Sequence, residues 1–106
     1  MTQEEFDQVL EKRIEEIQKV LLVKRKEYAR NDNPLHNFDI AARVAGTSRE
    51  KALWGFALKH YISLMDIFDD IERGSLPKEE VVEEKIGDLI NYLILAEASI
   101  KDRLKK

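Results

Sequence analysis

The stretch Glu84-Lys-Ile-Gly-Asp88-Leu-Ile-Asn91-Tyr92-Leu-Ile-Leu95 carries two rows of side chains with different chemistry. Glu84, Asp88 and Asn91 are spaced i, i+4, i+7, so on a helix they form one polar row. An apolar row at near-heptad spacing runs beside it and consists of Val82, Ile86, Leu89, Leu93, Ala96 and Ile100. The stretch therefore predicts a long helix with a core-facing apolar row and a polar row at its edge.

The first third of the chain predicts one long helix and one short helix. Thr2-Gln-Glu-Glu5 is a capping-box pattern, and it opens a helix that we expect over residues 3–30. Asn31-Asp-Asn-Pro34 ends this helix, because its side chains form turns and proline restricts the residue before it. We expect a short helix over residues 36–45, closed by Gly46.

The remaining sequence predicts two more long helices. Thr47-Ser-Arg-Glu50 is a second capping box, and Gly74 ends the helix that it opens. Ser75-Leu-Pro77 starts the last helix. The expected core row of the middle helix consists of Leu53, Ala57, His60, Leu64, Ile67 and Ile71. Strand patterns are absent, so we expect a single all-α domain over residues 1–106 with three long helices and one short helix.

Composition restricts the class of protein. Charged residues make up 37% of the 106 residues, but the net charge is only −3, which argues against a general nucleic-acid binder. The chain contains no cysteine, which excludes disulfides and thiol chemistry. The sequence shows no secretory signal and no apolar run of membrane length. We therefore expect a cytoplasmic protein.

The short turn near residue 75 predicts that the last two helices run antiparallel, with residues whose numbers add up to about 150 at the same level. Two polar rows then face each other. The expected facing pairs are Asp66 with Glu84, Ser63 with Asp88, and Lys59 with Asn91. One interpretation is a pair of solvated helix flanks with loose ion pairs.

The other interpretation is a magnesium site. Mg²⁺ takes oxygen ligands and keeps several waters, so carboxylates from two helices at one level suit it. The candidate metal ligands are Glu84, Asp88 and Asp66. Lys59 could neutralise phosphate oxygens nearby, and Asn91 could orient a ligand or a water molecule.

Four short segments within residues 24–97 form a recognisable set. They are Lys26-Glu27-Tyr28, Asn37-Phe38 with Ile40-Ala41, the stretch from Ala57 to Leu64, and Asp88-Leu-Ile-Asn91-Tyr92. Together they resemble the phage and prophage proteins termed nucleotide-modification-associated domains. Those proteins are similar in turn to the MazG-like all-α nucleoside-triphosphate pyrophosphohydrolases. The resemblance implies an Mg²⁺-dependent nucleotide-binding protein of phage or prophage origin.

The chain departs from this family pattern in several places. Ala29 stands where glycine is usual, and Ser63 stands where arginine is usual. Glu79-Glu-Val-Val-Glu83 matches the first acidic cluster of the MazG-like signature, but we interpret it as the acidic first turn of a helix. The second cluster, Glu-x-x-Asp, has no match at a suitable distance. Hydrolysis of the α–β phosphoanhydride of a nucleoside triphosphate is one hypothesis, and nucleotide binding without cleavage is another.

Further candidates have two interpretations each. His60 lies on the apolar row, so we favour a packed core histidine over a ligand or a general base. The basic end of the first helix, which includes Lys26, either favours the helix dipole or binds phosphate. Tyr28 could stack on a base, but a core position is the default for Tyr28, Phe38, Trp54 and Tyr61.

Apolar residues outside the core rows predict self-association. Leu22, Val23, Trp54, Ile90 and Ile94 need cover that a three-helix core does not supply. A homo-oligomer, with a symmetric dimer that completes a helical bundle, would supply it. The alternative function, from a different class, is a non-catalytic helical interaction protein of phage origin, in which the polar rows are simply surface.

Overall fold

The computed structural model describes residues 1–28, 30 and 32–105, and of residues 24–28 it describes the backbone alone. These residues form four helices: α1 (Gln3–Tyr28), α2 (His36–Ala45), α3 (Arg49–Glu72) and α4 (Glu79–Leu104). No strand occurs in this part of the chain. The prediction of an all-α fold with three long helices and one short helix is confirmed.

The expected starts and ends hold for the first two helices, with a small shift. The hydroxyl of Thr2 accepts a hydrogen bond from the backbone N–H of Glu5 at 3.1 Å, as the capping box predicts. Helix α1 ends at Tyr28, two residues before the predicted boundary. Helix α2 has the predicted bounds, and Gly46 closes it in the left-handed conformation at a φ of 66°.

Two predictions of helix starts were wrong by one or more residues. Ser48, and not Thr47, caps α3, and its hydroxyl accepts the N–H of Lys51 at 3.1 Å. Both residues are good caps, so the pattern Thr-Ser leaves the choice to the neighbouring turn. Helix α4 begins at Glu79 after an extended Lys78 without a side-chain cap, so Ser75-Leu-Pro77 belongs to the connection.

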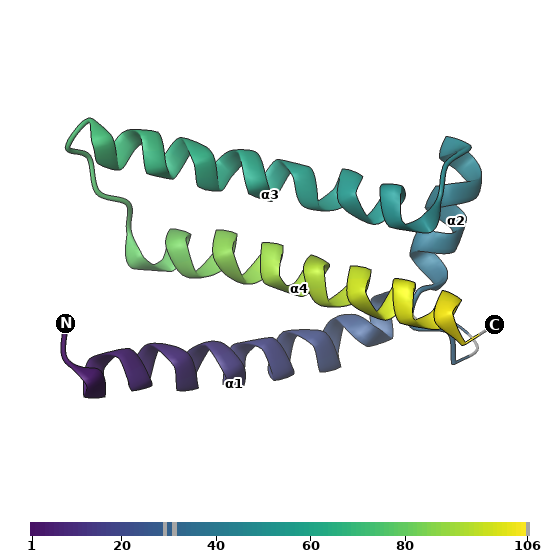
Figure 1. The fold of residues 1–106 in the computed structure, drawn as a ribbon, viewed down its shortest axis with the longest axis horizontal. Coiled ribbons are helices and arrows are strands. Elements are labelled where there is room, and N and C mark those ends of the chain that lie inside the picture. Colours follow the sequence, from purple (N-terminus) through teal and green to yellow (C-terminus); the bar gives the residue numbers. More distant parts are fainter. Residues whose placement is uncertain (29, 31, 106) are drawn as a thin grey trace.

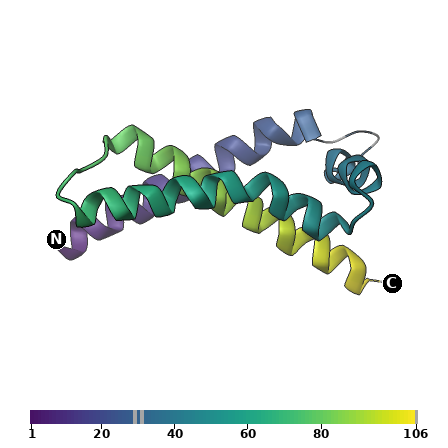
Figure 2. The same ribbon diagram turned by 90° about the horizontal axis from the view of Figure 1, so that it is seen from above.

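Helix α4 lies in the middle of the fold, between α3 and α1 (Figure 1). Helix α3 runs antiparallel to α4, as predicted, whereas α1 runs in the same direction as α4. Helices α1 and α4 cross when the molecule is seen from above (Figure 2). Within the described residues, α1 and α3 both contact α4 but do not contact each other. The fold is therefore an open row of helices.

The best-buried apolar side chains gather at the end of the molecule where α2 lies. Leu35, Phe38 and Leu53 form a buried cluster. Tyr92, Leu95 and Ala96 of α4 pack against it. This core holds one end of the α3–α4 pair together, and it confirms the core position of Phe38. Trp54 and Tyr61 are both substantially exposed, so the default core assignment was wrong for these two aromatics.

The predicted register of α3 and α4 is confirmed. Contacts join residues whose numbers add up to about 150, such as Arg49 with Ser99, Phe56 with Tyr92 and His60 with Asp88. The predicted core row of α3 is also confirmed at Leu53, Ala57 and His60, which are buried. It was wrong at Ile71, which is 44% exposed near the end of the helix.

The predicted core row of α4 was wrong at Leu93 and Ile100, whereas its member Ala96 packs against the apolar cluster. The side chains of α4 that meet α3 and the apolar cluster are Asp88, Tyr92, Leu95 and Ser99. The predicted row lies one residue further along, and its members Leu93 and Ile100 are 53% and 49% exposed. One residue turns a helix by about 100°. Leu93 and Ile100 therefore face away from the core of their own chain.

Candidate functional site

A buried histidine and a carboxylate meet at the centre of the α3–α4 pair. His60 is 9% exposed, and its Nδ1 lies 3.5 Å from Oδ2 of Asp88. The ring of His60 also stacks on Tyr92, with 5.6 Å between the ring centroids. The structure thus confirms a packed His60. It also corrects the pairing of Asp88 with Ser63, whose hydroxyl donates instead to the carbonyl of Lys59 at 2.9 Å.

Asn91 is the second polar side chain buried in this region. It is only 7% exposed, and its Oδ1 has no hydrogen-bond partner among the described residues. An unsatisfied buried acceptor costs about 1–3 kcal/mol, so native proteins rarely leave one without a purpose. A donor from a ligand or from a bound water would satisfy it. Asn91 therefore marks the place where a donor group is expected.

The predicted polar residues of α3 and α4 lie on one face of the helix pair. Lys59, Ser63 and Asp66 each precede a core-facing residue of α3 by one position, and Gly87 and Asn91 do the same on α4. Such a step turns each helix by about 100°. Because the two helices are antiparallel, both turns lead to the same side. We call this side, with Lys59, Ser63, Asp66, Glu84 and Asn91, the polar face.

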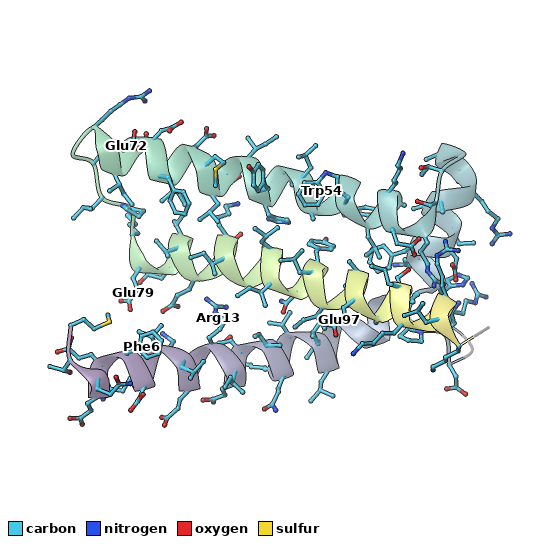
Figure 3. All side chains as sticks on the ribbon, in the orientation of Figure 1. Phe6, Arg13, Trp54, Glu72, Glu79 and Glu97 are labelled. Carbon is cyan, nitrogen blue, oxygen red and sulfur yellow. The ribbon has the colours of Figure 1, made fainter. Side chains whose placement is uncertain are left out.

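Helix α1 lies on the same side, held at one end by polar contacts to α4. Lys12 forms an ion pair with Glu83 at 2.6 Å, and Nη2 of Arg13 donates to the carbonyl of Glu83 at 3.0 Å. The hydrogen bond with Glu83 raises the pKa of Lys12. Arg13 reaches from α1 toward α4 (Figure 3), where a Cβ on Gly87 would lie 2.5 Å from its Nη1.

The missing side chain of Gly87 therefore gives Arg13 room to lie against α4, and the sequence analysis missed this role of Gly87. The signal was available, because a glycine inside a helix costs about 1 kcal/mol relative to alanine.

The three candidate metal ligands differ in their exposure and orientation. Asp66 and Glu84 are exposed, whereas Asp88 turns toward His60. Within the described residues, no group of three or more histidine, aspartate or glutamate side chains could hold a metal ion. A magnesium site built from Glu84, Asp88 and Asp66 stays a prediction. The side chains of Lys26 and Tyr28 lie outside the described part of the chain.

A second polar cluster joins α2, α3 and α4 at the other end of the pair, and the sequence analysis missed it. The half-buried Arg49 donates to Asp39 at 3.1 Å, to the carbonyl of Ser99 at 3.0 Å and to Asp102 at 3.1 Å. Its Nε also donates to the hydroxyl of the fully buried Ser99 at 2.6 Å. That hydroxyl donates to Glu50, which in turn accepts from Arg103 at 2.7 Å.

These contacts shift the ionisation of the acidic members. Burial alone would raise the pKa of Asp39, but hydrogen bonds from Asn33 and Arg49 outweigh it and lower that pKa. Burial would likewise raise the pKa of Glu50, but the hydrogen bonds from Ser99 and Arg103 outweigh it and lower that pKa. The charged forms are thus held in the fold. With every charge partnered, we interpret this cluster as a structural clamp and not as a binding site.

Comparisons with known proteins add no relative. No protein-family model, no curated protein and no solved structure matches the chain. The resemblance to nucleotide-modification-associated domains thus stays a prediction from the four segments. Among the described residues, no helix is both long and apolar enough to cross a membrane.

Proposed function

We propose that the chain binds a nucleotide on the polar face, in a Mg²⁺-dependent manner. The observation that carries the proposal is the buried Asn91, whose Oδ1 lacks a hydrogen-bond donor among the described residues. It lies beside the buried His60–Asp88 pair. Polar groups that converge at a partly apolar helix junction are typical of small-molecule sites. The exocyclic amine of a base or a sugar hydroxyl would supply the missing donor.

The proposal assigns the charged groups by their position. Lys59 is exposed at the level of Asn91 and would pair with phosphate oxygens. Mg²⁺ often binds through one or two carboxylates, with waters and phosphate oxygens completing the shell. Asp66, Glu84 and Asp88 can act in this way without forming a three-carboxylate cage. Lys26 and Tyr28 extend the proposed site toward the end of α1.

Hydrolysis of the α–β phosphoanhydride is the reaction that this proposal would add to binding. The metal would polarise a phosphoryl oxygen and lower the pKa of a bound water. The support for this step is the resemblance of Asp88-Leu-Ile-Asn91-Tyr92 to the family motif.

The second candidate is a non-catalytic helical interaction protein of phage origin. It is favoured by the many half-exposed apolar side chains, which include Leu22, Val23 and Trp54. Large exposed apolar surfaces are typical of protein–protein contacts. In either case we propose that the chain is a homo-oligomer, because exposed apolar side chains such as Trp54 need cover.

A thermal-shift screen of nucleoside mono-, di- and triphosphates, each with Mg²⁺ or with EDTA, tests the nucleotide proposal. A ligand at a hundredfold excess over its Kd stabilises the folded state by about 2.7 kcal/mol. We expect a rise in melting temperature with Mg²⁺ that shrinks with EDTA. Lys59→Met should reduce this shift, whereas Lys51→Met, which removes an exposed lysine of the same helix, should not. Equal shifts in both variants would contradict the assignment of Lys59.

A further inference from the structure

The side of the α3–α4 pair that lies opposite the polar face is covered by uncharged side chains. Each of these side chains comes one residue after a core-facing position, whereas those of the polar face come one residue before. A step of one residue turns a helix by about 100°, so the rows of both helices lie together on this side. We call this surface the open face. Its members are Trp54, Leu58, Tyr61, Met65 and Phe68 on α3, and Val82, Ile86, Leu89, Leu93, Ala96 and Ile100 on α4.

Both rows have the spacing of a helix-packing seam. Successive members are alternately four and three residues apart on each helix, which is the pattern that inserts side chains into the holes of a facing helix. The rows are also in register, because Leu58 lies level with Leu93 and Tyr61 with Leu89. A pair of parallel seams at one level suits a second helical hairpin of the same length.

The open face is only partly covered by its own chain, through Ala96, which packs against the apolar cluster. Phe68 is 47% exposed, and Trp54 is 46% exposed although its ring packs on Tyr61. Helix α1 cannot cover it, because the contacts of α1 with α4 are made through Glu83 and Gly87 on the other side. Leaving this many large apolar groups in water is unfavourable, so the surface requires an occupant.

The total surface indicates how large that occupant must be. The chain exposes 8029 Å², whereas a folded monomer of this mass usually exposes about 6,100 Å². Its radius of gyration is 16.1 Å, compared with about 13 Å for a compact domain of this length. The excess of about 1,900 Å² lies within the range of roughly 1,000–2,500 Å² that each chain buries in an obligate dimer.

We propose that a second copy of this chain occupies the open face, so that two α3–α4 pairs form a four-helix bundle around a two-fold axis. This inference rests on the homo-oligomer proposed above and names its surface. A second copy fits because two equal uncharged faces with the same seam spacing are complementary to each other. The polar face and α1 then lie on the outside of the dimer, where a nucleotide can reach them.

Sedimentation equilibrium on three chains tests the surface. The wild type should have the mass of two chains at micromolar concentration. Leu58→Glu with Leu93→Glu places charges at the centre of the open face and should give the mass of one chain. The control, Val9→Glu, charges a 58% exposed apolar position on α1 and should leave the dimer intact.

Trp54 gives a second readout in the unmodified protein, because it is the single tryptophan of the chain and lies on the open face. In the dimer its ring should be shielded, so acrylamide should quench its fluorescence at least twofold less at 100 µM than in samples diluted until the mass falls to one chain. This comparison needs no substitution, so it remains decisive if the doubly charged variant does not fold.

The results separate the surface from self-association itself. A wild-type dimer that persists in the folded double variant but dissociates in Val9→Glu would assign the interface to α1 and overturn this inference. Equal quenching of Trp54 in dimer and monomer would also overturn it. A wild type that remains a single chain at 100 µM would refute the homo-oligomer as well, and the open face would then fit a different protein.

Discussion

Replacing Arg49 by methionine should remove the clamp that joins α2 and α3 to the end of α4. The change deletes four hydrogen bonds to Asp39, Ser99 and Asp102 but keeps most of the apolar stem. Hydrogen bonds to charged groups contribute about 1.5–3 kcal/mol each when buried. The carboxylates of Asp39 and Asp102 are 35% and 42% exposed, so water can replace part of what they lose.

Water cannot reach the buried hydroxyl and carbonyl of Ser99 in this way, so these two groups should account for most of the lost stability. We expect a decrease of about 3 kcal/mol in the free energy of unfolding, comparable to breaking a buried ion pair. Urea denaturation followed by circular dichroism, at one protein concentration, measures it. Lys101→Met is the control, because its ion pair with Glu97 is exposed and should contribute little to stability. A loss below 1 kcal/mol in Arg49→Met would refute the clamp.

Three further predictions concern stability. The pKa values of Asp39 and Glu50 are lowered in the fold, so their stabilising charge is present above the unfolded pKa values of about 4 and is lost as the pH falls through the folded values. The melting temperature should therefore drop steeply below about pH 4 in a pH series. A melting temperature that does not change with pH would contradict the direction of these pKa shifts. Ser48→Ala should cost about 1 kcal/mol in urea denaturation and Thr47→Ala much less, since Ser48 caps α3; the reverse order would restore the original assignment. His60→Ala should cost roughly 2–4 kcal/mol, because it leaves a cavity against Tyr92, and unchanged stability with lost nucleotide binding would move His60 from the core to the site.

The helices and their register were predictable because their signals are local. Thr2, Gly46 and the turn near Gly74 each act within a few residues, and the short connection fixes the level of α3 against α4. The core row of α3 was also correct up to Ile67, because Leu53, Ala57 and His60 form a single core-facing row that continues into Leu64 and Ile67.

The rows of α4 could not be assigned from hydrophobicity. Leu93 belongs to the most regular apolar row, but an apolar row exposed on the surface of its own chain looks the same in the sequence as one that faces the core. The residues that do face α3 include Asp88 and Ser99, whose polar groups lie against His60 and Arg49. Those partners lie on another helix, so the contacts of Asp88 and Ser99 can be found only from the register of α3 against α4.

The shared face of two candidate residues was predictable, but their detailed geometry was not. Lys59 and Asn91 share a face, as the facing-row argument implied. The burial of Asn91 and the turn of Asp88 toward His60 depend on how closely the helices approach, which no local pattern encodes.

Calorimetric titration of the screened nucleotide into wild type and Asp88→Asn, with and without Mg²⁺, tests the proposed Mg²⁺-dependent nucleotide site most directly. The substitution is nearly isosteric, so the fold and the packing against His60 should survive. We expect the Mg²⁺-dependent affinity to fall at least about tenfold, because a metal ligand is lost. Asp69→Asn, at an exposed position of α3 away from the polar face, should bind like the wild type. Equal affinities for wild type and Asp88→Asn, or no Mg²⁺-dependent binding in any chain, would contradict the nucleotide site and leave the interaction protein as the function.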